Sequence, residues 1–312
     1  MRVFLACLSL LAASPAGAQG LAIVLNSGDA SLSVLDESTG AELRRLPVLR
    51  EPHHVALSPD GKELLVGDSA GNEMLFLDPQ TGAIRRRMPL ADPYHLQFSP
   101  NGKYLVVTGL GRNQVDVYDG KTTEFVKRFP AKTMPSHIAF SPDSTMAYAT
   151  LQGTNKLAAY DLKTLSIAWT AEVGNTPAGV VWHDGKLLVA DMGTDYVAVV
   201  NPADGAVERK IVTGRGAHQI FPSPDGKLLY VNNRVDGTTT ALDAKTLTLV
   251  RTYRVPGGPD CIDFAQDGKL WITQRFIQKV AVLDPVTGDL HSFPVGRSPH
   301  GIFLTDGLRE RF

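Results

Sequence analysis

Histidine is the residue type whose placement in this chain is most informative about chemistry. Six of the eight histidines of the 312-residue sequence fall at two adjacent positions of a repeated segment. Along the chain, the first position reads His53, Tyr94, Ser136, Ala178, His218, Asp260 and His300, and the second reads His54, His95, His137, Gly179, Gln219, Cys261 and Gly301. Chance placement would not gather histidine at equivalent positions in this way, so these side chains are the first candidates for a functional site.

Imidazole nitrogen and cysteine sulfur are ligands that zinc, copper and iron prefer. Three consecutive repeats supply His54, His95 and His137 at the second position, and Cys261 takes that position in a later repeat. We therefore predict that these four residues hold a metal, either Zn²⁺ or Cu²⁺ or the metal of a haem-like cofactor. Two other interpretations stay open: the imidazoles bond to carbonyls of neighbouring repeats and are structural, or they transfer protons.

The first-position histidines are expected to form a separate set. Adjacent residues of an extended strand point in opposite directions, so both positions should not face the same volume. His53, His218 and His300 are accordingly predicted to contact a small-molecule ligand rather than the metal.

Loops expected at the same end of the repeats carry further candidates, Arg112, Arg234, Arg275 and Phe276. A guanidinium can hold a carboxylate or a phosphate through two parallel hydrogen bonds, and an exposed aromatic ring can contact a ligand or a partner. These four residues are added to the predicted ligand site, although solvated loop cations and a ring packed on the next repeat are the plain alternatives.

The repeat also predicts the elements that carry these residues. A turn recurs every 39 to 42 residues, ending at Gly61, Gly102, Ser144, Gly185, Gly226, Gly268 and Gly307. A period of this length with strand-like content is typical of propeller blades, and short apolar runs between Pro, Asp and Gly turns indicate strands. The fold is therefore predicted to be all-β, a seven-bladed β-propeller with four-stranded blades.

The two ends of the chain complement each other in this scheme. The last repeat has room for one strand, near residues 301–304, and the missing three are found near residues 22–25, 31–35 and 42–46. The seventh blade is therefore predicted to combine both ends, which closes the ring and leaves only short, protected strand edges.

Composition and the N-terminal residues indicate where the protein is expected to work. A net charge of −1 gives no electrostatic basis for binding nucleic acid. Residues 1–18 have the features of a secretory signal peptide, with Arg2, an apolar run and Ala16-Gly17-Ala18. We expect residues 19–312 to form a single exported domain, periplasmic in a Gram-negative host and otherwise secreted, with no membrane span and no internal disulfide.

The repeat resembles that of the YVTN family of β-propellers. The shared pattern stands here as Pro52 with Ser58-Pro59-Asp60-Gly61-Lys62, and again as Pro93 with Ser99-Pro100-Asn101-Gly102-Lys103. The strand end Val231-Asn232-Asn233 is close to the tetrapeptide that names the family. The resemblance covers residues 20–307 and implies the propeller fold. Similar propellers are exported proteins of unknown role, accompany quinone-dependent oxidation systems, bind haem d1 or act as lactonases, so it implies no single activity.

Three functions follow as hypotheses. The first is a non-enzymatic exported propeller that binds a small molecule, a metal ion or a metallocofactor at a histidine-lined channel mouth and assists a periplasmic redox protein. The second is a lactonase-like hydrolase that uses a channel-mouth metal or a histidine base. The third is a protein-interaction scaffold in which the histidines are structural. Covalent attachment of haem in the c-type manner is excluded, because the chain has no Cys-x-x-Cys-His segment.

Overall fold

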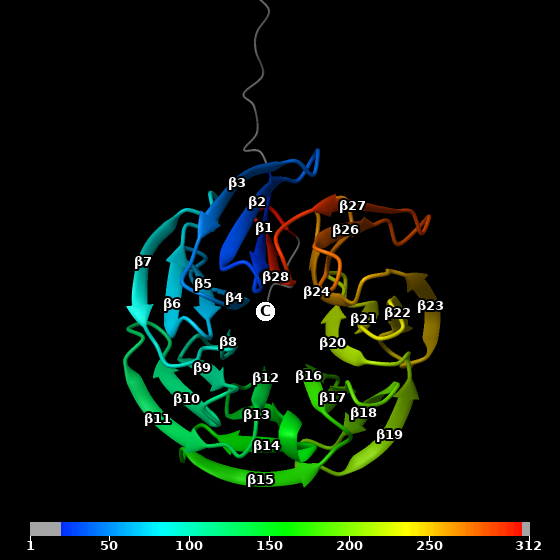
Figure 1. Ribbon diagram of the computed structural model, residues 1–312. Helices are drawn as coiled ribbons and strands as arrows, with labels where there is room; N and C mark the ends of the chain where they lie inside the picture. Colours follow the sequence, from blue (N-terminus) through cyan, green and yellow to red (C-terminus); the bar gives the residue numbers. More distant parts are fainter. Residues whose placement is uncertain (1–19, 308–312) are drawn as a thin grey trace, which may run out of the picture.

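The computed structural model describes residues 20–307, so the predicted signal peptide at residues 1–18 lies outside the described residues. Seven four-stranded antiparallel sheets surround a central axis (Figure 1), which confirms the predicted all-β, seven-bladed propeller. In residues 20–307 the helical content is one 3₁₀ turn, η1 (Gln152–Thr154). No helix within this range is long and apolar enough to cross a membrane.

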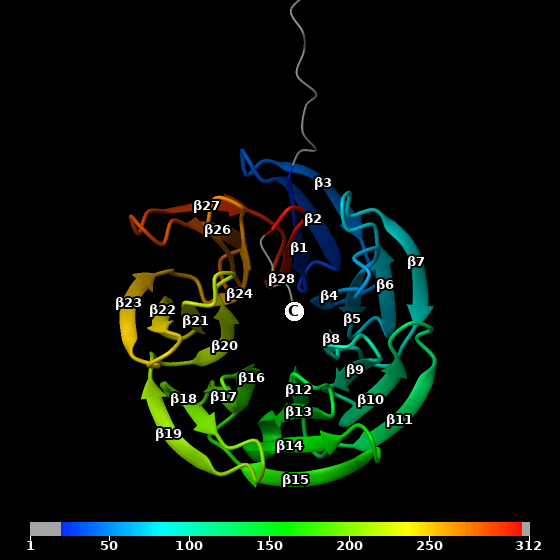
Figure 2. The same ribbon diagram turned by 180° about the vertical axis from the view of Figure 1, so that it is seen from behind.

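Each sheet runs from an innermost strand at the axis to an outermost strand at the rim, and Figure 2 shows the same ring from behind. The innermost strands are β4 (Pro52–Leu57), β8 (His95–Phe98), β12 (Pro135–Phe140), β16 (Pro177–His183), β20 (Ala217–Pro222), β24 (Pro259–Phe264) and β28 (Pro299–Leu304). The second strands are β5 (Leu64–Asp68), β9 (Tyr104–Gly109), β13 (Met146–Leu151), β17 (Lys186–Asp191), β21 (Leu228–Asn233), β25 (Leu270–Gln274) and β1 (Leu21–Asn26).

The third strands are β6 (Glu73–Leu77), β10 (Gln114–Asp119), β14 (Lys156–Asp161), β18 (Tyr196–Val200), β22 (Thr238–Asp243), β26 (Lys279–Leu283) and β2 (Ser31–Asp36). The outermost strands are β7 (Ile84–Pro89), β11 (Phe125–Pro130), β15 (Ser166–Glu172), β19 (Val207–Val212), β23 (Leu249–Arg254), β27 (Leu290–Pro294) and β3 (Glu42–Pro47).

The hydrophobic core is divided among the contacts between neighbouring sheets. Seven clusters of buried apolar side chains lie one between each pair of adjacent blades. Second and third strands are covered on both faces and are buried along their length, as in β1, β2, β5 and β6, whereas outer strands such as β3 are mostly exposed. Burial of apolar area against both neighbours therefore fixes the position of every blade.

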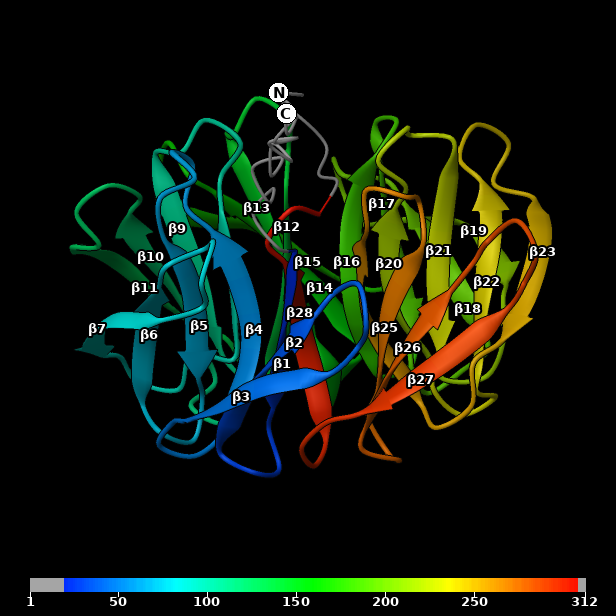
Figure 3. The ribbon, with the colours of Figure 1, turned by 90° about the horizontal axis from the view of Figure 1, so that it is seen from above.

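The ring is closed by the two ends of the chain. β28 pairs antiparallel with β1, and Ala22 lies opposite Leu304, Ile23 opposite Phe303 and Val24 opposite Ile302. These are the segments that the sequence analysis predicted to meet, and the two strands lie side by side in Figure 3. The closure gives β1 a partner on each side.

Because successive strands are antiparallel, the connections alternate between two faces of the ring. We call the face with the Ser-Pro-Asp-Gly turns the turn face. The opposite one, where each outermost strand leads into the next innermost strand, is the loop face. The turns between third and outermost strands are held by an Asp or Asn side chain; Asp36, for example, accepts the backbone N–H groups of Ser38 and Thr39 at 2.8 and 2.9 Å.

Candidate functional site

The two histidine positions lie in a β-bulge at the start of six of the seven innermost strands, the exception being β8. Pro52 pairs with Asp68 but Val55 pairs with Val66, so one extra residue is accommodated at His53 and His54. The same shift occurs at the equivalent positions of β12, β16, β20, β24 and β28. In a bulge, two residues of one strand lie opposite a single residue of the partner strand, and the side chains of the two residues point in new directions.

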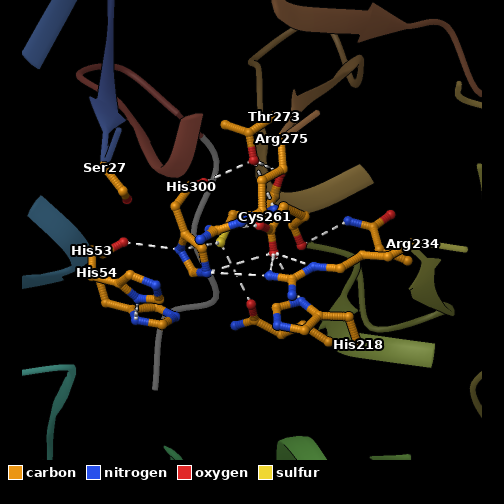
Figure 4. Close-up of polar contacts among 12 residues, drawn as sticks. Ser27, His53, His54, His218, Arg234, Cys261, Thr273, Arg275 and His300 are labelled. Atoms are coloured by element: carbon orange, nitrogen blue, oxygen red, sulfur yellow. Dashed lines mark hydrogen bonds and ion pairs between the residues drawn. The ribbon is translucent and has the colours of Figure 1, made fainter. Parts of the chain in front are cut away.

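The bulges overturn the expectation that the two positions face different volumes, because strict alternation does not hold where an extra residue is inserted. His53 and His54 approach each other through their Nδ1 atoms, 2.9 Å apart. The ring centroids of His53 and His300 are 3.7 Å apart, and those of His54 and His300 are 4.4 Å apart. First-position and second-position histidines therefore form one cluster rather than two sets (Figure 4).

The cluster contains all six histidines of the two positions. The ring centroid of His54 is 4.5 Å from that of His95 and 4.9 Å from that of His137, and His95 and His137 are 5.0 Å apart. His218 joins through His137, at 5.3 Å, and through His300, at 6.0 Å. Each of the six is at most 9% exposed, so this histidine cluster is buried rather than arranged around an open mouth.

The bulged backbone is held by the preceding blade. Thr150 donates its hydroxyl to the carbonyl of Ala178 at 2.7 Å, and Thr273 donates to the carbonyl of His300 at the same distance. The Asn232 side-chain amide donates to the carbonyl of Asp260 at 3.0 Å. These first-position carbonyls would otherwise lack a partner. A hydroxyl or amide near the end of the preceding blade's second strand therefore fixes the position of the bulged backbone.

Hydrogen bonds determine where two of the imidazoles carry their proton. Nδ1 of His54 lies 2.9 Å from the carbonyl oxygen of Tyr94, and Nδ1 of His300 lies 2.9 Å from that of His53. A carbonyl only accepts, so both Nδ1 atoms donate. Nε2 of His54 then carries a free lone pair, whereas Nε2 of His300 lies 3.5 Å from a terminal nitrogen of Arg234. A metal-ligating histidine is usually oriented by a bond of this kind from its other nitrogen.

Several ring nitrogens in the cluster have no hydrogen-bond partner within the described part of the chain. They are Nε2 of His54, Nδ1 of His95, Nε2 of His137 and Nε2 of His218, all buried. A buried polar atom without a partner costs about 1–3 kcal/mol. The concentration of four such atoms in one cluster indicates that the cluster has the capacity to bind a further group.

Asp260 is the anionic centre of the site. Its Oδ1 lies 2.9 Å from Nδ1 of His218, 2.5 Å from a terminal nitrogen of Arg234 and 3.6 Å from Nε2 of His300. Its Oδ2 lies 3.3 Å from a terminal nitrogen of Arg275. Burial opposes the charged form, but Arg234, His218 and Arg275 hold the pKa of this carboxyl well below its usual range. Asp260 is therefore an ionised, fully buried carboxylate.

The imidazoles themselves are neutral. Burial lowers the pKa of His95 to about 3 and that of His218 to about 4. Burial also holds the pKa of the other four histidines of the cluster well below the ordinary value. Neutral imidazole is the form that ligates metals.

Potential ligand atoms converge in two groups in residues 20–307. In each group the atoms all lie within 4.8 Å of one another: His53, His54 and His300 form one, and His218, Asp260 and His300 form the other. His300 belongs to both. Of the predicted metal ligands, His54 is in a group, whereas His95, His137 and Cys261 are in neither.

Cys261 lies at the edge of the histidine cluster. Its Sγ is 3.6 Å from Nδ1 of His300 and 3.5 Å from Oε1 of Gln219, to which the thiol donates. Burial, together with Asp260, raises the pKa of Cys261 well above its usual value. The residue therefore stands as a protonated thiol in the cluster.

The predicted loop residues separate into two kinds. Arg234 and Arg275 reach inward to Asp260, with 16% and 21% of their side chains exposed. Arg112 is exposed, and its guanidinium lies 3.5 Å from Oδ1 of Asn72, away from the cluster. Phe276 is 64% exposed on the loop face. The two inward arginines thus pair with the Asp260 carboxylate rather than with a ligand.

Residues 67–71 read Gly-Asp-Ser-Ala-Gly, the spacing of a hydrolase nucleophile elbow. Such an elbow joins a strand to a helix and exposes its serine. Here the segment joins strands β5 and β6, Ser69 is buried, and its hydroxyl donates to the carbonyl of Glu51. The segment is therefore an ordinary interstrand loop.

Two further parts of the site were not among the predicted site residues, although the repeat alignment contained both. Tyr94 stands at the first position of the second blade, and its ring packs at a tilt against that of His53, with centroids 4.1 Å apart. Asp260 stands at the first position of the sixth blade and was not among the predicted ligands. Its central role depends on two arginines from different loops, which sequence spacing does not bring together.

Comparisons with known proteins agree with this architecture. A family model described as a YNCE-like beta-propeller matches residues 4–309. Among curated proteins, none matches the sequence.

Solved structures share the fold at low identity. A functionally unknown protein from Desulfotomaculum acetoxidans superposes with a TM-score of 0.77 at 15% identity, covering 91% of this chain and 98% of that chain. Dihydro-heme d1 dehydrogenase NirN in complex with DHE gives 0.69 at 15% identity, covering 96% and 78%. Virginiamycin B lyase from Staphylococcus aureus gives 0.68 at 15% identity, covering 82% and 92%. At such identities the likeness shows the fold alone.

Proposed function

The chain belongs to the YNCE-like β-propeller family, and we propose that it binds a transition-metal ion, Zn²⁺ or Cu²⁺, in the histidine cluster at its axis. The observation that supports this proposal is the set of buried ring nitrogens without partners, two of which belong to imidazoles whose other nitrogen is hydrogen-bonded, His54 and His137. An ion ligated by Nε2 of His54 and Nε2 of His218 would remove the cost of burying these two atoms unpaired.

The proposed ligands are His53, His54 and His300, with His218 and Asp260 next to them. A zinc ion takes three or four nitrogen, sulfur or oxygen atoms at about 2.0–2.3 Å. Ligand atoms within 4.8 Å of one another reach that arrangement with small side-chain rotations. The cation would also gain from the Asp260 carboxylate, which carries the negative charge of the site.

A bare ion fits better than a haem-like macrocycle. Neighbouring imidazole rings of the cluster have centroids 3.7 to 6.0 Å apart. Such spacing leaves no room for a flat macrocycle between the rings, whereas an ion would be bound at the ring nitrogens. The ligand named for NirN is therefore not carried over to this cluster.

Export is part of the proposal. The N-terminal residues 1–18 have the composition of a secretory signal, which supports a periplasmic or secreted protein. The buried ion would then be held outside the cytoplasm, and the protein would assist a periplasmic redox protein. We propose that the protein is a binding protein rather than an enzyme, because the inward arginines are engaged by Asp260 and not directed at an open substrate site.

The test is titration of metal-free protein, made without a polyhistidine tag, with Zn²⁺ and Cu²⁺ by calorimetry. We expect one ion per chain, and the variant His300→Gln should weaken binding by about 100-fold or more, because this residue belongs to both ligand groups. His291→Gln is the matched control, since His291 is exposed on an outermost strand.

Circular dichroism establishes that each variant is folded. If His300→Gln does not fold, His54→Gln takes its place with the same expectation. Wild-type protein that binds neither ion more tightly than these variants would refute the metal proposal and leave the histidines with a structural role.

A further inference from the structure

A cavity of about 450 Å³ lies in the central channel between the histidine cluster and the turn face. Its inner end is formed by His95, His137 and Gln219, and its outer end by Pro100, Pro222 and Pro224. A smaller cavity of about 280 Å³ adjoins it, with His95, Gln219 and Phe221 in both walls. The channel is thus hollow on the turn-face side of the cluster.

The walls of the larger cavity are mainly apolar, and aromatic rings contribute to them. Five rings line it, from five consecutive blades: Phe98, Phe140, Trp182, Phe221 and Phe264. Phe98, Trp182 and Phe221 are half-buried: each packs against an apolar cluster between blades and leaves part of its ring accessible. Large rings that stay accessible inside a channel, with few polar groups at one end, are typical of a site for a small organic ligand.

We propose that this cavity binds a small, flat aromatic molecule that carries no negative charge and has one hydrogen-bonding group. The aromatic body would lie against the rings of Phe98, Trp182 and Phe221, and the polar group would reach His95, His137 or Gln219. A volume of about 450 Å³ falls in the range of small-molecule sites, about 300–1,000 Å³.

The residues of the wall disfavour an anionic ligand. Of the residues described in the wall, none is a lysine or an arginine, and Asp263 is the one carboxylic acid. Its two oxygens accept the backbone N–H groups of Phe264 and Leu304, at 2.9 and 2.7 Å. The described wall offers an anionic ligand no cation, because the imidazoles of His95 and His137 are neutral.

The polar end gives the site its selectivity. His95 and His137 each have a ring nitrogen without a partner, and a neutral imidazole can donate or accept a hydrogen bond. A ligand hydroxyl would pair with such a group, whereas a ligand of the same shape without the hydroxyl would leave it unpaired. This inference does not depend on metal binding, because the aromatic wall and the polar end are parts of the protein itself.

The probes are 7-hydroxy-4-methylcoumarin and its counterpart without the hydroxyl, 4-methylcoumarin, each titrated into metal-free protein by calorimetry. We expect the hydroxylated probe to bind one per chain and about tenfold or more tightly than its counterpart. Using metal-free protein separates failure of this proposal from failure of the proposed metal site.

Two pairs of variants locate the probe. Val181 lines the cavity and is half-buried, so Val181→Trp should fill it and weaken binding by about tenfold or more. Val250→Trp is the control, because Val250 is 56% exposed on an outermost strand. Quenching of tryptophan fluorescence by the probe should disappear largely in Trp182→Phe and persist in Trp169→Phe, since Trp169 lies on an outermost strand.

The proposal is overturned if the hydroxylated probe fails to bind. It is also overturned if Val181→Trp and Val250→Trp bind equally, or if the hydroxyl makes no difference.

Discussion

At the scale of single residues, Asp68 and Asp191 show how equivalent positions acquire different chemistry. Both end the second strand of a blade and both are fully buried. Asp68 accepts backbone N–H groups of Arg50, Glu51 and Gly71 at 2.8, 2.6 and 2.8 Å. Neither oxygen of Asp191 has a partner in residues 20–307, and burial raises the pKa of Asp191 to about 8.

This difference predicts a pH effect on stability. Between the ordinary pKa of 3.8 and the value of about 8, folded protein keeps a proton on Asp191 that unfolded protein has released. The contribution of this group to the free energy of unfolding is therefore complete below pH 4 and falls as the pH rises toward 8. The slope is at most about 1.4 kcal/mol per pH unit.

The measurement compares urea unfolding of wild type and Asp191→Asn at several pH values between about 5 and 8. The variant cannot titrate at this position, so its stability relative to wild type should increase with pH. Glu124→Gln, at an exposed carboxylate, should parallel wild type. Parallel pH profiles for wild type and Asp191→Asn would show that Asp191 is ionised in the folded protein.

Residue types alone identified the six histidines as special, because the repeat aligned them at two positions. What could not be predicted is that Asp260 would join them through Arg234 and Arg275, which come from loops of two different blades. Ion pairs across blades depend on the reach and direction of long side chains, which the period of a repeat does not specify.

At the scale of elements, the glycines of the second position explain why two blades lack a side chain there. A Cβ at Gly179 would lie 2.6 Å from Cα of Gln219 and 2.7 Å from the carbonyl oxygen of His218. One at Gly301 would lie 2.9 Å from the carbonyl oxygen of His53. Glycine therefore lets the next blade come close at the level of the histidine cluster.

Gly179→Ala should consequently disturb both stability and the site. The added methyl meets backbone atoms, which do not move easily, so we expect a loss of about 1–3 kcal/mol in urea unfolding. Metal affinity should fall as well, because the displaced backbone carries His218. Gly111→Ala is the control, since a Cβ there meets only Asp92 Oδ2, at 3.4 Å. Equal stability of the two variants would contradict the close approach of the blades.

Strand content and strand order were predictable from the alternation of apolar runs and turn residues. The bulges were not, since one extra residue in a strand of six leaves the apolar pattern almost unchanged. A usable signal does exist: Thr150, Asn232 and Thr273 stand near the ends of the second strands and bond the bulged carbonyls. In the sequence, a polar residue in an otherwise apolar buried strand therefore indicates a hydrogen bond to a bulged carbonyl.

At the scale of the whole molecule, stability depends on closing the ring. β28 packs against β24 and β4 and pairs with β1. Deleting residues 298–312 would remove this strand and leave one side of β1 unpaired, and an unpaired strand edge promotes association between chains. We expect a lower melting temperature and aggregation, measured by calorimetry and light scattering.

The control is a chain that ends at Gly307, which keeps all of β28. It should melt like the full chain and stay monodisperse if the full chain does. A deletion of residues 298–312 that remains monodisperse with an unchanged melting temperature would show that β28 is not needed to close the ring.

The bulge at the inner edge of the blades has one more consequence. Apart from Cys261, its residues lie outside the seven apolar clusters that hold neighbouring sheets together, and in β4 it brings the side chains of His53 and His54 into one cluster. Wherever neither position has to be glycine or packs in such a cluster, both can change without altering the packing of the blades. The side chains at these bulge positions can therefore be exchanged while the fold stays the same. A propeller of the same shape with different residues at these positions would bind an unrelated ligand.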